Sequence, residues 1–247
     1  MKSIRTWFLP LLLLTACHPH TPEGTALITG KIAGGQGAVW ILEELDPMGA
    51  AVLDTVTADA GGSFRFPVNA TEAGFYILKT PDGRMTIITA KPGDTIRVTG
   101  DLTRFPGEVT VDGSDDARLL SEFYRHASRN KALSDSLQSV LAYHRDDSLF
   151  TPLTLKFDSI FQHIWDDQRA FNSQFIRKHP SSFASLVVVN YSFGTRPVLS
   201  PDSDRAFYLT VDSALSIRYP GNRHVEYNKK NIAGYVRREQ LDRGSNH

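Results

Sequence analysis

The spacing of apolar residues changes at residue 113, and this change limits what the chain can fold into. From residue 26 to residue 112, short apolar runs are separated by turn residues, a pattern typical of an antiparallel β-sandwich or barrel. From Ser114 onward glycine becomes rare and apolar residues recur with the 3.6-residue period of a helix. The sequence therefore predicts an α+β protein, with a β-sandwich or barrel over residues 25–112 followed by an α-helical domain over residues 113–241.

Two tight turns stand out in the β half. Asp59-Ala60-Gly61-Gly62 lies between two alternating runs, which predicts a hairpin from Thr57 to Val68 with Phe64 and Phe66 on one side. Pro81-Asp82-Gly83 likewise predicts a hairpin between the run that starts at Phe75 and the run that starts at Met85. The other strand candidates are residues 26–32, 39–42, 52–58, 95–99 and 109–111.

The helical half begins at Ser114, a good N-cap, and the acidic residues Asp115 and Asp116 complement the dipole of the first turn. The longest predicted helix begins at Thr151-Pro152 and ends at His179-Pro180. Its apolar stripe is Leu153, Phe157, Ile160, Phe161, Ile164, Phe171 and Phe175. Shorter helices are predicted from residue 114 and over residues 134–144, 182–190, 202–219 and 223–241. The helix over 134–144 is expected to bury Leu137, Val140 and Leu141.

The first 16 residues have the order of a secretory signal peptide. Lys2 and Arg5 precede an apolar run that is far shorter than the roughly 20 residues that span a bilayer. The ending Leu14-Thr15-Ala16-Cys17 resembles a bacterial lipobox. That resemblance implies cleavage before Cys17, a diacylglyceryl thioether on its sulfur and acylation of the new amino terminus. Residues 17–24 then form a tether, and two or more acyl chains hold a protein stably on a membrane.

Charge and cysteine content exclude several classes of function. Lys plus Arg and Asp plus Glu number 27 each, so no net field attracts nucleic acid. Cys17 is the one cysteine, which excludes an internal disulfide, a CxxC redox pair and a thiolate metal cluster. The sequence contains no G-x-S-x-G, no P-loop and no G-x-G-x-x-G motif. We therefore predict a protein that is not an enzyme, with no catalytic residue and no cofactor.

The two halves together resemble an arrangement found in Bacteroidota lipoproteins, a DUF4369-type β domain followed by a helical segment. The resemblance covers about residues 24 to 230 in the same order as the family. The matching segments are Thr29-Gly30-Lys31-Ile32, Asp54-Thr55-Val56, Gly62-Ser63-Phe64-Arg65-Phe66, Phe75-Tyr76, Lys91-Pro92-Gly93-Asp94-Thr95-Ile96, Val111-Asp112-Gly113-Ser114 and Phe175-Ile176-Arg177-Lys178-His179-Pro180.

Many relatives in that family continue into a thioredoxin-like domain of the TlpA and AhpC/TSA kind, with a Trp-Cys-x-x-Cys active site. This chain has no such motif, so the redox activity is not carried over. The resemblance also bears on location, because relatives sent to the cell surface tend to carry acidic residues directly after the lipidated cysteine. His18-Pro19-His20-Thr21 has none, which favours the periplasmic face of the outer membrane.

Three groups of polar residues could suggest a metal site, and each has a simpler explanation. His18 and His20 on the tether are too few to close a site. Asp112, Asp115 and Asp116 lack the alternating ligands and terminal glutamate of a calcium loop, so helix capping explains them. His163, Asp166 and Asp167 lie on one predicted helix, where a solvated face with local pairing explains them. We predict no metal site.

Six triplets combine Asp with Ser or Thr and an aliphatic residue, and they resemble the O-glycosylation acceptor pattern of exported Bacteroidota proteins. Helix capping is the alternative explanation for several of them. The acceptor hydroxyls would belong to Thr55, Thr95, Ser136, Ser148, Ser159 and Ser213.

The function that the sequence favours is a non-catalytic, membrane-anchored binding or scaffold module of the cell envelope. Its partners would be the membrane, through the lipid on Cys17, and an envelope protein. Trp40, Phe64, Tyr76 and Trp165 are candidate contact residues, with burial in the core as the alternative for each. The alternative function is an accessory domain of a thioredoxin-like envelope redox system whose catalytic domain is absent from this chain.

Overall fold

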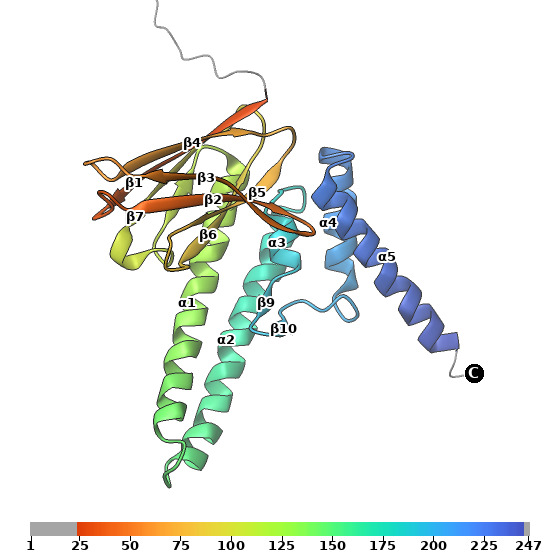
Figure 1. Ribbon diagram of the computed structural model, residues 1–247. Coiled ribbons are helices and arrows are strands. Elements are labelled where there is room, and N and C mark those ends of the chain that lie inside the picture. The colour runs from red at the N-terminus through yellow and green to blue at the C-terminus, as the bar shows by residue number, and fades with distance from the viewer. Residues whose placement is uncertain (1–23, 245–247) are drawn as a thin grey trace, which may run out of the picture.

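The computed structural model of the chain describes residues 24–244, with side chains described up to Tyr235. Two four-stranded sheets are followed by helices that pack against both of them, which confirms the α+β fold class (Figure 1). The strands are β1 (Thr25–Ala33), β2 (Val39–Asp46), β3 (Gly49–Thr57), β4 (Ser63–Asn69), β5 (Gly74–Lys79), β6 (Met85–Ala90), β7 (Thr95–Asp101) and β8 (Thr110–Asp112), with a 3₁₀ turn at Leu102–Arg104. The helices are α1 (Asp115–Tyr143), α2 (Phe150–Lys178), α3 (Ser185–Val189), α4 (Arg205–Arg218) and α5 (Arg223–Gly244), and the short strands β9 (Ser192–Phe193) and β10 (Arg196–Pro197) form a small ribbon.

The two sheets form a sandwich around a core of alternating residues. One sheet has the order β4-β1-β7-β8 and the other has the order β3-β2-β5-β6. All the strand pairs are antiparallel except β1 with β7, which are parallel. Side chains from the two inner faces meet in one apolar cluster, in which Trp40, Phe66 and Leu78 are fully buried. The alternation of side chains along each strand therefore places Trp40, Phe64, Phe66 and Tyr76 in the core.

One of the two predicted hairpins is wrong. β3 pairs with β2 and β4 pairs with β1, so the two strands on either side of the Asp59–Gly62 turn belong to different sheets. The turn itself forms, with the Gly62 amide donating to the Asp59 carbonyl at 3.0 Å and Gly62 at a φ of 75°. Turn residues specify a reversal of the chain, but the partner of each strand depends on which apolar faces meet. The second predicted hairpin is confirmed, because β5 pairs antiparallel with β6.

A β-bulge sends one hairpin out of the sandwich. The β2–β3 register shifts between Leu42 and Glu43, after the two inward residues Trp40 and Leu42. A bulge bends the strand and redirects the side chains that follow it. Beyond it, Leu45 packs on the helical core instead of the sandwich core. The end of this hairpin therefore lies against the helices, while β3 is exposed along almost its whole length.

The sheet that contains β5 is covered on both faces. Tyr76 and Leu78 point into the sandwich, whereas Phe75 points outward into a second core that the helices complete. Phe75 stacks on Phe183 with ring centroids 4.6 Å apart, and Asn222 donates to the Ala73 carbonyl at 2.7 Å. Residue 113 therefore marks a change from strands to helices, and it does not separate two independent cores. The outer face of this sheet and the helices together form the second core.

The first two predicted helices are one helix. α1 runs unbroken for 29 residues from Asp115, and the sequence between residues 128 and 136 contains no glycine or proline to end it. Ser114 is confirmed as the N-cap, with its hydroxyl accepting from the Ala117 amide at 3.3 Å. α2 begins at Phe150 rather than at the predicted Thr151-Pro152 cap, and it ends before His179 as predicted. α3, α4 and α5 match the three remaining predicted helices within a few residues.

Candidate functional site

The predicted lipidation residue, Cys17, lies outside the described residues. The described chain starts at Gly24, directly before β1, on the side of the molecule opposite the α1–α2 turn (Figure 1). No helix among residues 24–244 is long and apolar enough to cross a membrane. Any membrane attachment of this fold through Cys17 would therefore enter from the end of the sandwich that lies away from that turn.

The four aromatic residues considered for a contact surface do not form one. Trp40, Phe64 and Tyr76 lie in the sandwich core, and the rings of Trp40 and Phe64 stack with centroids 4.9 Å apart. Trp165 is half-buried on α2, and the Arg196 guanidinium carbon lies 3.9 Å from its ring centroid. The contact-surface hypothesis is wrong for the first three, because the alternation of their strands turns each of them inward.

The three aspartates near the start of α1 have separate partners. Asp112 pairs with Arg97 at 3.5 Å, and Asp115 pairs with Arg118 at 3.1 Å on the surface. Asp116 turns inward, where it accepts hydrogen bonds from the Ser182 hydroxyl and the Tyr219 hydroxyl at 2.6 Å each and from the Phe183 amide at 3.1 Å. Helix-dipole complementation alone had been expected for Asp116, but this carboxylate also joins α1 to the segments around α3 and α4.

His163, Asp166 and Asp167 are not brought together either. Asp166 accepts from Gln162 at 2.9 Å, while Asp167 accepts from Asn130 at 2.9 Å and lies 2.9 Å from the His126 ring on α1. His163 is exposed. Within the described part of the chain, no group of three or more His, Cys, Asp or Glu side chains is placed to hold a metal ion.

A buried polar network crosses between α1 and α2 near the middle of both helices. Asn130 donates to Gln168 at 3.0 Å, Gln168 donates to Asn172 at 2.8 Å, and Asn172 donates to the Val188 carbonyl at 2.9 Å. Gln168 and Asn172 are fully buried, and His126 stacks on Phe171 with centroids 4.0 Å apart. Burial lowers the pKa of His126, and the Asp167 carboxylate opposes that change. Satisfied polar groups of this kind fix the register of packed helices.

Beyond this network the α1–α2 hairpin extends away from the rest of the molecule (Figure 1). The hairpin consists of α1, the connecting turn and α2, and none of its residues between 135 and 156 is buried. At 1.5 Å per residue, each 29-residue helix is about 43 Å long. Two paired helices bury one strip each, so the other faces of this distal part remain in water.

One of these faces carries apolar side chains in a row. On α1 the row is Leu133 and Val140, seven residues apart, and on α2 it is Leu153 and Ile160, also seven apart. Seven residues make nearly two helical turns, so each pair lies on one face of its helix. His126 precedes Leu133 by seven and Asp167 follows Ile160 by seven.

The contact between His126 and Asp167 places both rows on the same side of the hairpin. We call these four residues the apolar stripe. Leu133 is 57% exposed, Val140 38% and Ile160 37%, and Leu153 is half-buried, whereas the sequence predicted burial of Val140 and placed Ile160 on an apolar stripe. Periodicity identifies the apolar face of a helix, but it does not say whether a partner covers that face.

The six hydroxyls of the Asp-Ser/Thr-aliphatic triplets all lie on exposed residues. Three of them, Ser136, Ser148 and Ser159, belong to the distal part of the hairpin. Their positions are accessible to a modifying enzyme, and glycosylation of at least one of them stays a prediction.

Arg223 and His224 lie where the helices meet the sheet. Arg223 lies 3.3 Å from Asp46 and 3.2 Å from Glu72, and it also pairs with Glu44. His224 is buried and packs edge-on against Phe75 and Phe183. Three acidic side chains around one guanidinium hold the start of α5 on the β2–β3 hairpin and on the loop before β5.

No family model matches the chain, and no curated protein is similar to it in sequence.

Proposed function

We propose that this protein is a non-catalytic lipoprotein of the cell envelope, anchored through Cys17 in the outer membrane and facing the periplasm, and that it binds an envelope protein through the apolar stripe of the α1–α2 hairpin. The observation that carries the proposal is the stripe itself, on a part of the chain that contributes nothing to either core. Exposed apolar side chains that gather on one side of a hairpin are a feature of interaction sites.

The shape of the stripe favours a helical partner. Two neighbouring helices with apolar rows on one side form a shallow groove, and an amphipathic helix fills such a groove with residues spaced three, four and seven apart. Leu133 and Val140 would contact the partner helix from one side, and Leu153 and Ile160 would contact it from the other. The partner helix adds a third member to the two-helix hairpin and covers surface that is now in water.

The position of the stripe fits attachment through the N-terminus. The described chain starts on the side opposite the hairpin turn, so a lipid on Cys17 would leave the stripe far from the membrane surface (Figure 1). The hairpin then acts as a spacer of tens of ångströms. A protein that holds a binding surface away from its membrane serves as a scaffold or adaptor.

The anchor is tested by metabolic labelling with an alkyne analogue of palmitate. The wild-type protein is expected to take up the label and to sediment with membranes, whereas Cys17→Ser is expected to carry at least tenfold less label. The thioether and the acylated amino terminus both depend on that sulfur, and two or more acyl chains suffice for stable attachment. A wild-type protein as unlabelled as Cys17→Ser would contradict the anchor and the envelope location with it.

The binding surface is tested by co-purification from envelope extracts with quantitative mass spectrometry. The double variant Leu133→Lys/Ile160→Lys is expected to lose at least fivefold of the partner that wild type enriches, because buried apolar contacts at an interface centre dominate affinity. Leu209→Lys is the matched control, since Leu209 is 42% exposed on α4 and does not belong to the apolar stripe.

A partner retained equally by the stripe variant and the control variant would contradict the proposed surface. Loss of a CxxC-containing protein from the stripe variant alone would identify the thioredoxin-like accessory role as the actual function. Loss of a protein without that motif would support a scaffold role outside thiol chemistry.

A further inference from the structure

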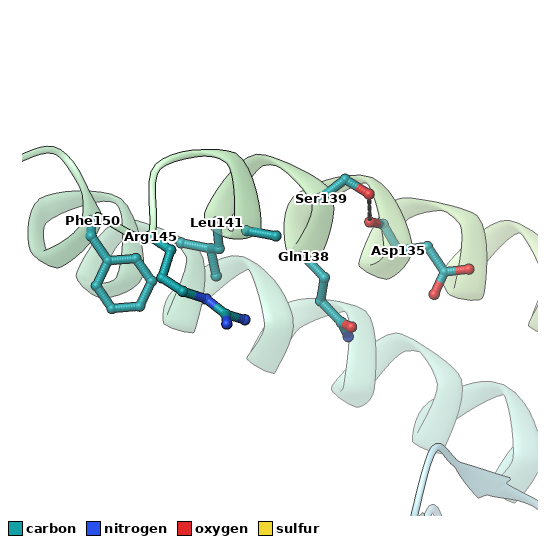
Figure 2. A pocket seen from close by; sticks show the side chains of 7 residues that line it. Asp135, Gln138, Ser139, Leu141, Arg145 and Phe150 are labelled. Atoms are coloured by element: carbon teal, nitrogen blue, oxygen red, sulfur yellow. Dashed lines mark hydrogen bonds between the residues drawn. The ribbon is translucent and has the colours of Figure 1, made fainter. Parts of the chain in front are cut away.

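A second surface lies on the other side of the same hairpin. An open groove of about 600 Å³ runs along the distal part of α1 and ends at the first residue of α2 (Figure 2). Leu141 and Phe150 supply its apolar lining, and the small residues Ser139 and Ala142 lie between its two ends along the chain. Asp135 and Ala142 of the groove lie two residues after Leu133 and Val140, which is about 200° around the helix. The groove therefore faces away from the apolar stripe.

The groove is charged at its two ends and uncharged in its middle. Asp135 lies at the end nearer the body of the protein, and Arg145 lies at the end nearer the hairpin turn (Figure 2). Asp135 makes only an exposed pair with Lys131, at 2.6 Å, and such pairs contribute little. Arg145 has no ion pair among the described residues, although it is the one cation that lines the groove.

This order of charges is complementary to itself when the helix is reversed. The midpoint of Asp135 and Arg145 in the chain is residue 140, one position after Ser139 and two positions before Ala142. If two copies of α1 cross antiparallel about a two-fold axis at that midpoint, Asp135 of each copy meets Arg145 of the other. The small side chains at the axis let the two helices approach closely, and Leu141 and Phe150 become covered.

We propose that this groove is an isologous interface through which two copies of the chain form an antiparallel dimer. A two-fold axis makes both ion pairs at once, which is how symmetric dimers use one surface patch twice. Parallel association would instead place Asp135 beside Asp135 and Arg145 beside Arg145, so charge selects the antiparallel arrangement. Because the formal net charge of the chain is zero, the copies do not repel one another over long distances.

A charge exchange tests the dimer. The mature chain, residues 17–247 with Cys17→Ser, contains every described helix and strand and needs no lipid. Its sedimentation equilibrium is expected to show a dimer, and Asp135→Arg or Arg145→Asp alone is expected to raise the dissociation constant at least tenfold. The double variant Asp135→Arg/Arg145→Asp exchanges the two charges and is expected to return within about threefold of wild type. Circular dichroism checks that each variant is folded.

Disulfide trapping provides a second measurement, because with Cys17→Ser an introduced cysteine is the only thiol. Ala142→Cys, close to the proposed axis, is expected to form a covalent dimer with a mild oxidant. Val140→Cys is the matched control, because it lies on the same turn of α1 but belongs to the apolar stripe. A monomeric wild type, single charge variants that dimerise normally, or trapping at Val140 and not at Ala142 would overturn the proposal. None of these results bears on the partner expected at the stripe, except trapping at Val140, which would assign the stripe to a second copy.

Discussion

Asp116→Ala is expected to lower the free energy of unfolding by about 3–5 kcal/mol, the effect of leaving a buried polar cluster without its charged acceptor. Asp116 is 8% exposed, and three donors from the segments around α3 and α4 converge on its two carboxylate oxygens. Without it, the Tyr219 and Ser182 hydroxyls keep no partner for their protons. Urea unfolding followed by circular dichroism measures the change.

The neighbouring residue provides a matched control. Asp115 is also an aspartate in the first turn of α1, but its side chain is 84% exposed. Asp115→Ala removes the same favourable interaction with the helix dipole, so it is expected to change stability by no more than about 0.5–1 kcal/mol. A loss for Asp116→Ala that is no larger than this would show that the inward contacts contribute nothing and that the dipole alone explains both residues.

A double-mutant cycle separates the hydrogen bond between Tyr219 and Asp116 from the other contacts of Asp116. Tyr219 donates to Asp116 at 2.6 Å, and Tyr219→Phe removes only the hydroxyl. The two substitutions together are expected to destabilise less than the sum of each alone, by about 0.5–3 kcal/mol. Strict additivity would mean that the hydroxyl and the carboxylate act independently, contrary to the geometry.

The role of Asp116 illustrates what the sequence could and could not predict. Ser114 followed by two aspartates predicted where the helix begins, because capping depends only on residues that are close in the chain. The inward direction of Asp116 depends on Ser182 and Tyr219, more than 60 positions further along. No local pattern contains that information, so two adjacent aspartates with the same predicted role have different ones.

The β half shows the same limit. Alternation identified the strands, and it placed Phe64 and Phe66 on the same side. It did not identify the strand pairs, because the turn at Asp59–Gly62 serves equally well within one sheet or between two. The parallel pairing of β1 with β7 brings together residues almost 70 positions apart, and it depends on how the two apolar faces close.

In the helical half, periodicity identified the apolar faces but not their surroundings. Phe157, Ile164 and Phe175 of the predicted stripe are buried, whereas Ile160 on the same stripe is exposed. The difference is one of direction, because Phe157 lies nearer the hairpin turn than Ile160 and is nevertheless buried, so the two side chains point in different directions around α2. Val140, Leu153 and Ile160 of the candidate binding surface lie on helix faces that the sequence predicted as apolar, whereas Leu133 was not predicted and the exposure of the surface could be seen only in the structure.

The start of α5 is expected to make the protein less stable in mild acid. Burial lowers the pKa of His224 to about 4, and the adjacent Arg223 cation acts in the same direction. The nearby carboxylates of Asp46 and Glu44 oppose the shift only partly. The ring therefore stays neutral in the folded protein through pH values at which an unfolded chain, with a histidine pKa of about 6.5, already takes up a proton.

The sign of the pH dependence follows from this difference. A pKa that is lower in the folded protein means that the unfolded state binds more protons between pH 6.5 and pH 4, so acid favours unfolding. The contribution of His224 is complete above about pH 6.5 and is lost as the pH falls towards 4. A difference of about 2.5 pKa units corresponds to about 3 kcal/mol in total, of which about 2 kcal/mol is lost by pH 5.

His224→Phe separates this effect from the titration of other groups. Phenylalanine keeps the edge-on contacts with Phe75 and Phe183 and has no proton to gain, and it also removes a buried ring nitrogen, Nε2, that has no hydrogen-bond partner. Between pH 7 and pH 5 the wild type is expected to lose about 2 kcal/mol more than His224→Phe in urea unfolding. His163→Phe, at an exposed position on α2, is expected to follow the wild type. Parallel curves for the wild type and His224→Phe would mean that His224 takes up its proton at the same pH in the folded and the unfolded protein, and that burial between sheet and helices does not disfavour the charged ring.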